Sequence, residues 1–304
     1  MSDTDNKAQN KAPNNLKDTR DKRKRVERIK NGIIIAIFVS IIVSILAVIG
    51  LIVAIVNMVI LGNKVEKLEQ GSSATVTQSS TVTTQDDSNL ILPGSGEVSK
   101  VYLTFDDGPS DNTDRILDIL KENDVKATFF LVAKEDEASK DRIKRMAAEG
   151  HSVGIHSFAH KYSEVYSSLD AFKTDVDKMI TYVDGILGYK PKLYRFPGGS
   201  GNKVTNVDIK ECIDYLDSKN LAYYDWNVSG GDSSSNAYTS DELVENVMKD
   251  VLKYKTSVVL LHDDNTKGAT VEALPKLIEQ LKGANVEILP ITDSTPLVQH
   301  VKAE

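Results

Sequence analysis

The feature that most constrains the fold is an alternation of short β-rich runs with helix-like segments over residues 97–304. The β-rich runs lie at 101–105, 127–132, 152–156, 193–196, 221–226, 257–262 and 286–289. The helix-like segments lie at 113–122, 139–149, 170–187, 207–218, 241–253 and 271–282. A strand followed by a helix, repeated about seven times, predicts an α/β fold with a parallel sheet and helices outside it.

The residues before this region divide into three predicted zones. Residues 1–31 form a polar, basic tail that has too few large apolar residues to fold by itself. Residues 32–62 contain an apolar run without charge or proline, longer than the ~20 residues that span a bilayer, which predicts a single transmembrane helix. Residues 63–96 are rich in Ser, Thr and Gln and predict a flexible stalk.

The charge distribution orients the predicted helix. Residues 1–30 carry ten Lys/Arg against five Asp/Glu, a net +5, so the chain total of −7 leaves −12 for the remainder. Because flanking Lys and Arg stay on the cytoplasmic side, the tail is predicted to be cytoplasmic and the stalk and residues 97–304 extracytoplasmic. A cleaved signal peptide is the competing interpretation, but the run exceeds the ~7–15 apolar residues of such peptides. Membrane lipid is therefore an expected partner and nucleic acid is not.

Polar residues stand where the predicted strands end. In parallel sheets the ligand site forms at the carboxyl ends of the strands, so residues distant in sequence converge there. The residues at these ends are Asp106 and Asp107, His156, Arg195, Asp225 and His262. We expect them to lie on one rim of the sheet.

Two histidines of this set have the spacing of metal ligands. His156 and His160 are separated by three residues, which lets two imidazoles face one ion, although two surface histidines after a strand would look the same. Adding Asp107 gives two nitrogens and one oxygen, the donor set of a catalytic metal site. We expect His151 and His300 to be solvent-exposed and outside this site. The single cysteine, Cys212, excludes an internal disulfide and a cysteine-based zinc cluster.

Adjacent carboxylates such as Asp106 and Asp107 repel each other and most often belong to a solvated loop or a helix cap. Here a β-rich run leads into the pair and Gly108–Pro109 bends the chain directly after it. The bend allows a division of roles, with one side chain facing a metal and the other facing the water that reacts.

Five motifs, TFDDGPS, HSFAH, RFPGGS, YYDWNV and LLHDD, occur in this order. Together they resemble the motifs of the carbohydrate esterase family 4 polysaccharide deacetylases, the NodB-homology domain, over about residues 100–290. The resemblance implies a distorted (β/α) barrel of about seven parallel strands that removes acetyl groups from N-acetylated sugars or acetylated xylan. It also implies one divalent metal ion, Zn²⁺ in the first place, with Co²⁺ or another divalent ion as alternatives.

Carried over position by position, the resemblance implies that Asp107, His156 and His160 bind the metal. Asp106 would be the general base, His262 the general acid, Arg195 the residue that orients Asp106, and Asp225 a residue that holds a partner in the right charge state. The substrate-binding residues implied are Phe196, Pro197, Gly198, Trp226 and Leu260, with the Gly198 N–H as a donor to the oxyanion. Gly198 departs from the family pattern, which has an aromatic residue there, so the shape of the substrate site is expected to differ. Asp263, after His262, is expected to support the site or to cap the next loop.

The anchor, the stalk and the resemblance together predict a cell-membrane enzyme that removes N-acetyl groups from wall glycan, in particular from N-acetylglucosamine of peptidoglycan. The alternatives are a deacetylase of chitin oligomers or acetylxylan, and a catalytically inactive glycan-binding surface protein. The sequence makes no prediction of the oligomeric state.

Overall fold

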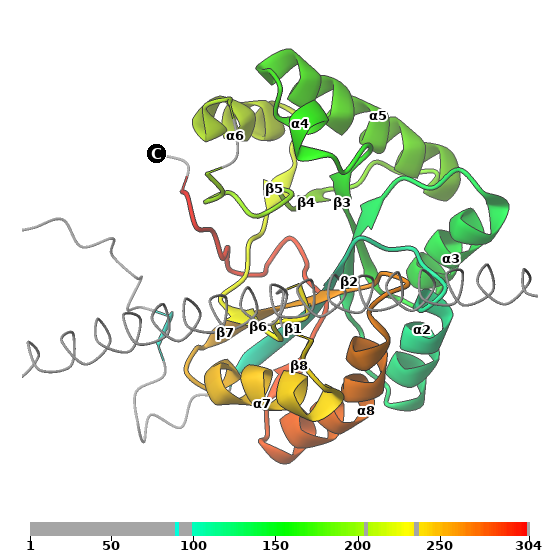
Figure 1. Ribbon diagram of the computed structural model, residues 1–304, viewed down its shortest axis with the longest axis vertical. Coiled ribbons are helices and arrows are strands. Elements are labelled where there is room, and N and C mark those ends of the chain that lie inside the picture. The colour runs from blue at the N-terminus through cyan, green and yellow to red at the C-terminus, as the bar shows by residue number, and fades with distance from the viewer. Residues whose placement is uncertain (1–88, 91–98, 204–205, 234–236, 303–304) are drawn as a thin grey trace, which may run out of the picture. The chain divides into compact units, whose positions relative to one another are not determined.

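The computed structural model describes residues 89–90, 99–203, 206–233 and 237–302, all of them within one compact unit, Thr83–Glu304. This unit has strands at its centre and helices around them (Figure 1). The predicted tail at 1–31, the predicted transmembrane helix at 32–62 and nearly all of the predicted stalk at 63–96 lie outside the described residues. Among the residues that are described, none of the helices combines the length and apolar character needed to cross a bilayer.

The element order alternates strand and helix along most of the unit. The strands are β1 (Lys100–Asp106), β2 (Thr128–Val132), β3 (Ser152–Ser157), β4 (Leu193–Tyr194), β5 (Ala222–Tyr223), β6 (Val228–Ser229), β7 (Thr256–His262) and β8 (Glu287–Ile288). The helices are α2 (Thr113–Glu122), α3 (Glu137–Ala148), α4 (Tyr162–Val165), α5 (Leu169–Leu187), α6 (Ile209–Ser218), α7 (Ser240–Val251) and α8 (Gly268–Gly283). All seven predicted strands and six predicted helices occur. The sequence did not predict β6 and α4, which are too short to carry a periodic pattern.

The sheet is parallel and strongly curled. Its strands follow the order β5-β4-β3-β2-β1-β7-β6, and β8 pairs with the beginning of β1. Although β5 and β6 lie at opposite ends of this order, they follow each other in the chain with only residues 224–227 between them. Because an extended residue spans at most about 3.6 Å, the two ends of the sheet must approach each other. The fold is therefore an α/β half-barrel, as the predicted distorted barrel of about seven strands requires.

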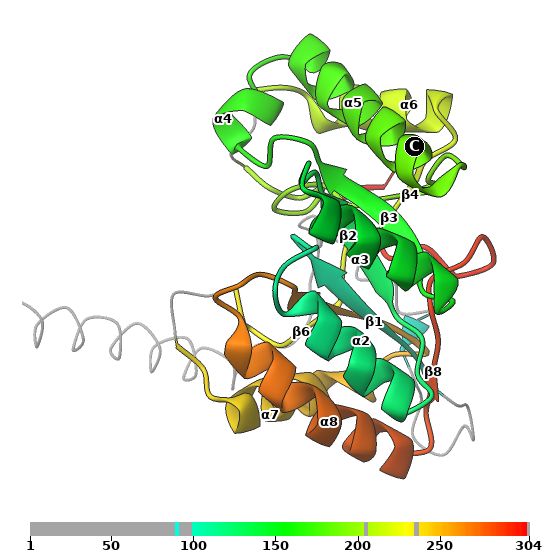
Figure 2. The same ribbon diagram turned by 90° about the vertical axis from the view of Figure 1, so that its right-hand side faces the viewer.

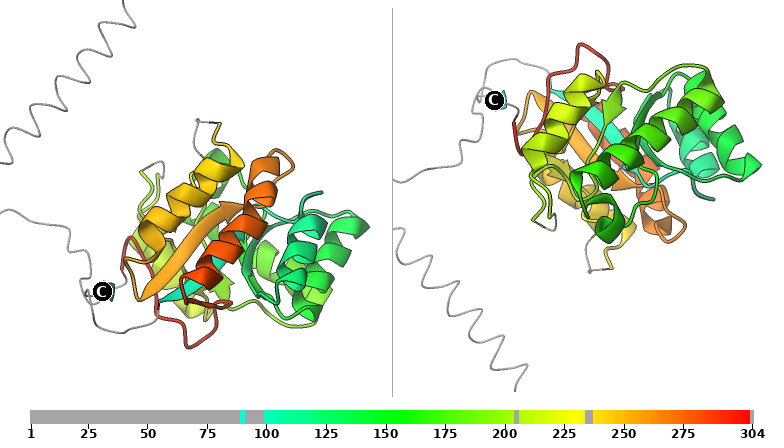
Figure 3. Two further views of the ribbon diagram at one scale, coloured as in Figure 1. Left: turned by 90° about the horizontal axis from the view of Figure 1, so that it is seen from below. Right: turned by 90° about the horizontal axis from the view of Figure 1, so that it is seen from above.

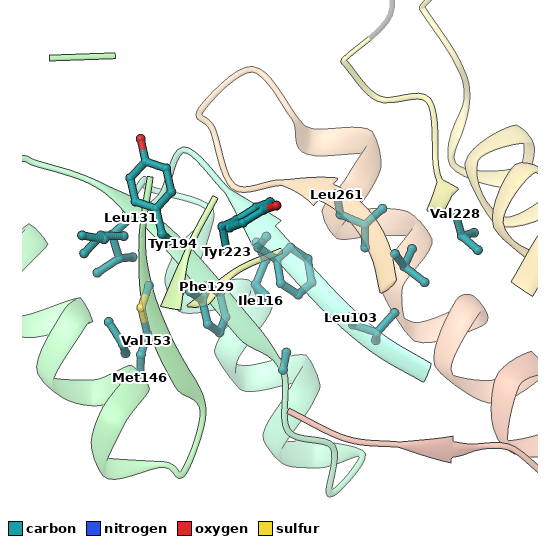
Figure 4. Close-up of a cluster of buried hydrophobic side chains, with 14 of the residues drawn as sticks. Leu103, Ile116, Phe129, Leu131, Met146, Val153, Tyr194, Tyr223, Val228 and Leu261 are labelled. Carbon is teal, nitrogen blue, oxygen red and sulfur yellow. The ribbon is translucent and has the colours of Figure 1, made fainter. Parts of the chain in front are cut away.

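Strand residues alternate between two apolar layers. Leu103 of β1, Phe129 of β2 and Leu261 of β7 point outward into the larger core beneath the helices (Figure 4), and Phe105 of β1 belongs to the same core. The intervening residues point inward, where Tyr102, Phe130, Leu193, Tyr224, Val258 and Ile291 form a second, smaller cluster. Since side chains alternate every second residue, Asp106 is in phase with Tyr102 and faces the interior of the half-barrel.

The helices form one continuous outer layer. They pack against one another in the order α7, α8, α2, α3, α5, α6, which follows the curl of the sheet. Figure 2 shows α2, α3 and α8 in front of the strands, and Figure 3 shows the helical cover from two further sides. Because helices cover the outer face, the open rim at the carboxyl ends of the strands is left for a ligand.

The first described residues, Asn89 and Leu90, bind at the amino end of β7. Asn89 Nδ2 donates to the Thr256 carbonyl oxygen at 3.0 Å, and Asn89 Oδ1 accepts from the Thr256 N–H at 2.8 Å. The Asn89 carbonyl oxygen accepts from the Lys255 N–H at 2.7 Å, and Leu90 forms an antiparallel bridge with Tyr254. This attachment lies at the opposite end of β7 from His262.

Gly154 of β3 leaves room for the inward-facing ring of Phe130. A Cβ atom at residue 154 would lie 2.7 Å from Phe130 Cδ1 and 3.0 Å from Leu193 Cβ. The Phe130 ring in turn supports the buried Arg195 guanidinium, whose Cζ lies 4.2 Å from the ring centroid. A side chain at residue 154 would therefore disturb the interior of the half-barrel.

We predict that Gly154→Ala lowers the free energy of unfolding by about 1–3 kcal/mol, because overpacking forces the Phe130 ring to shift. The matched control is Gly185→Ala in α5, where a Cβ meets nothing within 4 Å. There the helix propensity of alanine should raise stability by up to about 1 kcal/mol. Urea denaturation of both variants checks this, and equal effects of the two substitutions would contradict it.

Candidate active site

Three side chains that the sequence marked as metal ligands converge at the ends of β1 and β3. The ligand atoms of Asp107, His156 and His160 all lie within 4.8 Å of one another. Asp107 Oδ1 is 3.0 Å from His160 Nε2 and 3.7 Å from His156 Nε2. Two nitrogens and one carboxylate oxygen so arranged form a donor set that suits a divalent ion with positions left for water or substrate.

The tautomer of His156 is set by its backbone partner. His156 Nδ1 lies 2.7 Å from the Arg195 carbonyl oxygen, which can only accept, so Nδ1 carries the proton and Nε2 keeps its lone pair. Burial lowers the pKa of His156 and so favours the neutral imidazole. Neutral imidazole with the free nitrogen facing a carboxylate is the form that ligates a metal.

The Asp107 carboxylate has the charge state and the environment of a ligand. Burial acts to raise its pKa, but the neighbouring imidazoles of His160 and His156 outweigh this, and the pKa of Asp107 lies well below its usual range. Asp107 Oδ1 is buried and makes no well-aligned hydrogen bond within the described residues. A buried anionic oxygen facing two imidazole nitrogens fits a cation bound between them.

Asp263 holds the turn that follows Asp107. Asp107 has φ +72°, and Gly108–Pro109 is a cis peptide. The buried Asp263 carboxylate accepts hydrogen bonds from Ser110 Oγ at 2.6 Å and Thr113 Oγ1 at 2.5 Å, and burial raises its pKa. A Cβ at residue 108 would lie 2.5 Å from Asp263 Oδ2, so glycine is required there. Asp263 thus supports the site, as one of its two expected roles requires.

Asp175 of α5 holds the loop that carries His160. Its buried carboxylate accepts from the N–H groups of Phe158 and Ala159, both at 2.9 Å, and from Ser157 Oγ at 3.0 Å. Ser157 Oγ accepts in turn from the His160 N–H at 2.8 Å, and His160 has φ +49°. Because this left-handed conformation is unfavourable for histidine, the network of Asp175 maintains it. Sequence analysis missed Asp175 because it reads as an ordinary helical residue.

Asp106 forms a buried ion pair with Arg195. Arg195 NH1 lies 2.9 Å from Asp106 Oδ1 and 2.6 Å from Thr104 Oγ1. The same guanidinium donates to the carbonyl oxygens of Tyr224 and Asp225, both at 2.9 Å, and is wholly buried. With these donors committed, the guanidinium fixes the Asp106 carboxylate in one orientation beside the metal ligands.

Asp232, which the sequence analysis did not single out, holds His262. The His262 Nδ1 atom lies 2.8 Å from Asp232 Oδ1, and Asp232 Oδ2 accepts from the His262 N–H at 2.8 Å. Burial lowers the pKa of His262, but the Asp232 carboxylate outweighs it, so the pKa lies above its ordinary value. This arrangement favours an imidazolium that can donate a proton. Asp232 lies in a Gly-Gly-Asp-Ser stretch that has the composition of a turn, so only its position near His262 reveals it.

The Asp225 carboxylate binds Ser200 and His300, whereas His262 is bound by Asp232. Its carboxylate accepts from the Ser200 N–H at 2.8 Å, from Ser200 Oγ at 2.5 Å and from the His300 N–H at 2.7 Å. Asp225 therefore joins the turn after Arg195 to the C-terminal segment. The half-buried Trp226 ring lies 5.9 Å from Arg195 Cζ and contacts the His300 ring edge-on. Trp226 thus remains close to the predicted site.

The remaining predicted substrate residues face different ways. Gly198 is exposed with φ +78°, and Pro197 next to it is buried. Leu260 faces the interior next to Thr104 in register and is buried. The Phe196 ring is wholly buried and stacks on Phe172 at 5.8 Å in the outer core. This corrects the prediction for Phe196, because a ring packed beneath the helices cannot line a substrate surface.

His300 and His151, the two histidines that we expected outside the site, differ in their exposure to solvent. His300 is exposed, as expected, although Nε2 lies 2.7 Å from the Trp226 carbonyl oxygen. His151 is buried rather than exposed, and its Nδ1 accepts from the Ala127 N–H at 3.1 Å. Burial lowers the pKa of His151 to about 4. It lies at the amino end of β3, away from the metal ligands.

Comparison with known proteins gives consistent matches. The family model described as polysaccharide deacetylase matches residues 94–213. The chain is 36% identical to the Bacillus subtilis protein YheN, covering 60% of this chain and 63% of YheN. It is 32% identical to a peptidoglycan-N-acetylglucosamine deacetylase of Bacillus cereus, covering 63% of this chain and 69% of that protein. The chain thus spans about two thirds of the length of these relatives.

The solved catalytic domain of a peptidoglycan N-acetylglucosamine deacetylase from Eubacterium rectale superposes with a TM-score of 0.64 at 34% sequence identity. The match covers 71% of this chain and 97% of that domain. The chain belongs to the polysaccharide deacetylase family. Because these relatives are named as deacetylases, the rim of the half-barrel, where the Asp-His-His donor set lies, is the candidate active site.

For this deacetylase family member we predict that Asp175→Asn weakens Zn²⁺ binding by about ten- to a hundredfold, as loss of an outer support of a ligand does. The amide would replace one of the two accepting oxygens by an NH₂ group, which cannot accept from the N–H of residue 158 or of residue 159 that faces it, and this releases the His160 loop. Competition with a chromogenic chelator measures the affinity. Asp170→Asn, at an exposed position on the first turn of the same helix, is the control. Unchanged affinity in Asp175→Asn would contradict the positioning role.

Proposed function

We propose that this chain is a metal-dependent hydrolase that removes N-acetyl groups from cell-wall glycan, specifically from N-acetylglucosamine of peptidoglycan. The observation that carries the proposal is the juxtaposition of an Asp-His-His donor set with the Arg195–Asp106 ion pair and the His262–Asp232 pair, Asp106 and His262 being register partners at the ends of β1 and β7. The names of the Bacillus cereus and Eubacterium rectale relatives support the choice of substrate.

Amide hydrolysis needs a strong nucleophile, a stabilised oxyanion and a protonated leaving nitrogen. A divalent ion held by Asp107, His156 and His160 supplies activation of water and polarisation of the acetyl carbonyl when it is bound. Asp106, oriented by Arg195, takes the proton of the attacking water. The exposed Gly198 N–H can donate to the acetyl oxygen, and the His262 imidazolium protonates the departing amine.

The location of the enzyme is part of the same proposal. The apolar run within residues 32–62 would anchor the chain in the cell membrane, with the tail at 1–31 in the cytoplasm and the stalk at 63–96 outside. A catalytic unit tethered in this way reaches polymer close to the membrane, which favours wall glycan over soluble sugar.

The test is acetate release by the full chain, purified in mild detergent, from peptidoglycan fragments, chitin oligomers and acetylxylan, with Zn²⁺ and with chelator. We expect release from peptidoglycan that is lost with chelator. Preference for chitin oligomers or acetylxylan would overturn the substrate assignment. Absence of release from every substrate, with Zn²⁺ shown to be bound, would favour an inactive glycan-binding protein.

The adjacent aspartates should separate metal binding from turnover. Asp107→Asn removes a charged ligand and should abolish stoichiometric Zn²⁺ binding, measured by elemental analysis after gel filtration. Asp106→Asn should keep the metal and lower kcat by about 10²–10⁴-fold, the usual contribution of a general base. Retained metal in Asp107→Asn, or wild-type turnover in Asp106→Asn, would contradict the assignments.

The pH profile tests the role of His262. Its pKa is raised in the fold, and an acid must be protonated, so activity should fall as the pH rises through that pKa. Asp232→Asn removes the carboxylate that raises the pKa, so the alkaline limb of kcat/KM should move to lower pH. Asp225→Asn is the matched control because its carboxylate contacts Ser200 and His300 instead, and it should leave the limb in place whatever its effect on rate. An unmoved limb in Asp232→Asn would exclude His262 as the titrating acid.

A further inference from the structure

Gly198 has no side chain at the rim of the site, and a side chain from a second segment, α4, occupies the space beside it. A Cβ atom at residue 198 would lie 2.8 Å from Tyr162 Oη and 3.3 Å from Tyr162 Cζ. Its φ of +78° also falls in the region that disfavours any residue with a side chain. Position 198 is thus closed to a side chain of its own, and the phenol of Tyr162, from the short helix α4, occupies that place.

Two further contacts fasten Tyr162 beside Gly198. Its ring meets His160 edge-on at 6.4 Å between centroids on one side and Tyr166 at 6.0 Å on the other. The buried Tyr166 hydroxyl donates to the Pro197 carbonyl oxygen at 3.0 Å. The segment that follows the metal ligand His160 is therefore tied to the peptide that precedes Gly198, and the position of the Tyr162 ring is fixed between them.

The polar groups at this corner are unused within the described residues. Tyr162 is half-buried, and its hydroxyl makes no hydrogen bond there, although a partly buried phenol normally has a partner. The exposed Gly198 N–H also has no acceptor among the described residues. Two free donors, one from a side chain and one from the backbone, thus lie side by side next to a metal ligand. A ligand with several oxygen acceptors would satisfy both at once.

We propose that Tyr162 is a substrate-binding residue that determines specificity: its hydroxyl donates a hydrogen bond to the N-acetylated sugar that docks on the Gly198 N–H, and its ring forms the wall that residue 198 cannot supply. This inference rests on the proposed function and names the residue that shapes its substrate site. The wall of this site comes from α4 rather than from the turn after Arg195. The preference among N-acetylated sugars should therefore differ from that of a site whose wall is a side chain at residue 198.

The first test compares Tyr162→Phe with the wild-type full chain on the best N-acetylated glycan. Loss of one neutral hydrogen bond should raise KM about three- to tenfold, with kcat changed less than twofold. Tyr189→Phe, at an exposed tyrosine, is the matched control. Zn²⁺ content and thermal midpoint should equal the wild-type values. An unchanged KM would overturn the proposal, and so would a loss of Zn²⁺, which would mean that the hydroxyl acts on His160.

The second test measures binding without turnover. In the Asp106→Asn background, titration calorimetry with the tetramer of N-acetylglucosamine should show a dissociation constant that Tyr162→Phe raises by the same three- to tenfold factor. This result is independent of catalysis. Failure of wild-type acetate release would refute the proposed function, whereas equal tetramer affinity with and without the hydroxyl would refute the role of Tyr162.

The third test is a double-mutant cycle on the contact between residue 198 and Tyr162. Gly198→Ala should impair kcat/KM in the wild-type chain because the new methyl group displaces the Tyr162 hydroxyl and strains the backbone. In Tyr162→Phe the nearest ring atom lies 3.3 Å away, as Asn202 Cβ does, so the same substitution should cost several-fold less, leaving the backbone strain and these weaker contacts. Strictly additive effects would contradict the contact between the two residues.

Discussion

The half-barrel depends on one buried cation. The Arg195 guanidinium lies inside the curled sheet, where an unpaired charge would be costly, and it contacts three separate parts of the fold. It pairs with Asp106 at the end of β1, bonds the backbone between β5 and β6, and rests on the Phe130 ring of β2. The residue that orients the proposed base therefore also ties β1 to the connection between the two ends of the sheet.

The adjacent aspartates illustrate how a strand can place neighbours in one site. The alternation of β1 turns Asp106 inward, and a regular strand would send Asp107 to the helix-covered face. The left-handed conformation of Asp107 ends the strand and redirects its side chain toward the histidines. Such a conformation costs on the order of 1 kcal/mol or more, and the Asp263 contacts to the following turn maintain it.

Most of the fold and the centre of the site could be predicted from the sequence, because both depend on patterns of residues close together in the chain. Long strands and helices have periodic apolar residues, and the ends of the strands carry the polar side chains that meet at the rim. What escaped prediction depends on long-range contacts. Asp175 and Asp232 act on groups that only the fold brings to them, and Phe196 faces the core because it follows β4 in phase with Tyr194, which lies in the same core.

Asn89 binds Thr256, the first residue of β7, whereas His262 is the last residue of the same strand. A strand of seven residues is about 20 Å long, so the point where the preceding chain joins the unit lies that far from His262 at the opposite end. β1 pairs with β7 in parallel over the full length of both strands. The attachment at Asn89 and the candidate active site therefore use opposite ends of the same strand pair, so contacts made at one end leave the side chains at the other end in place.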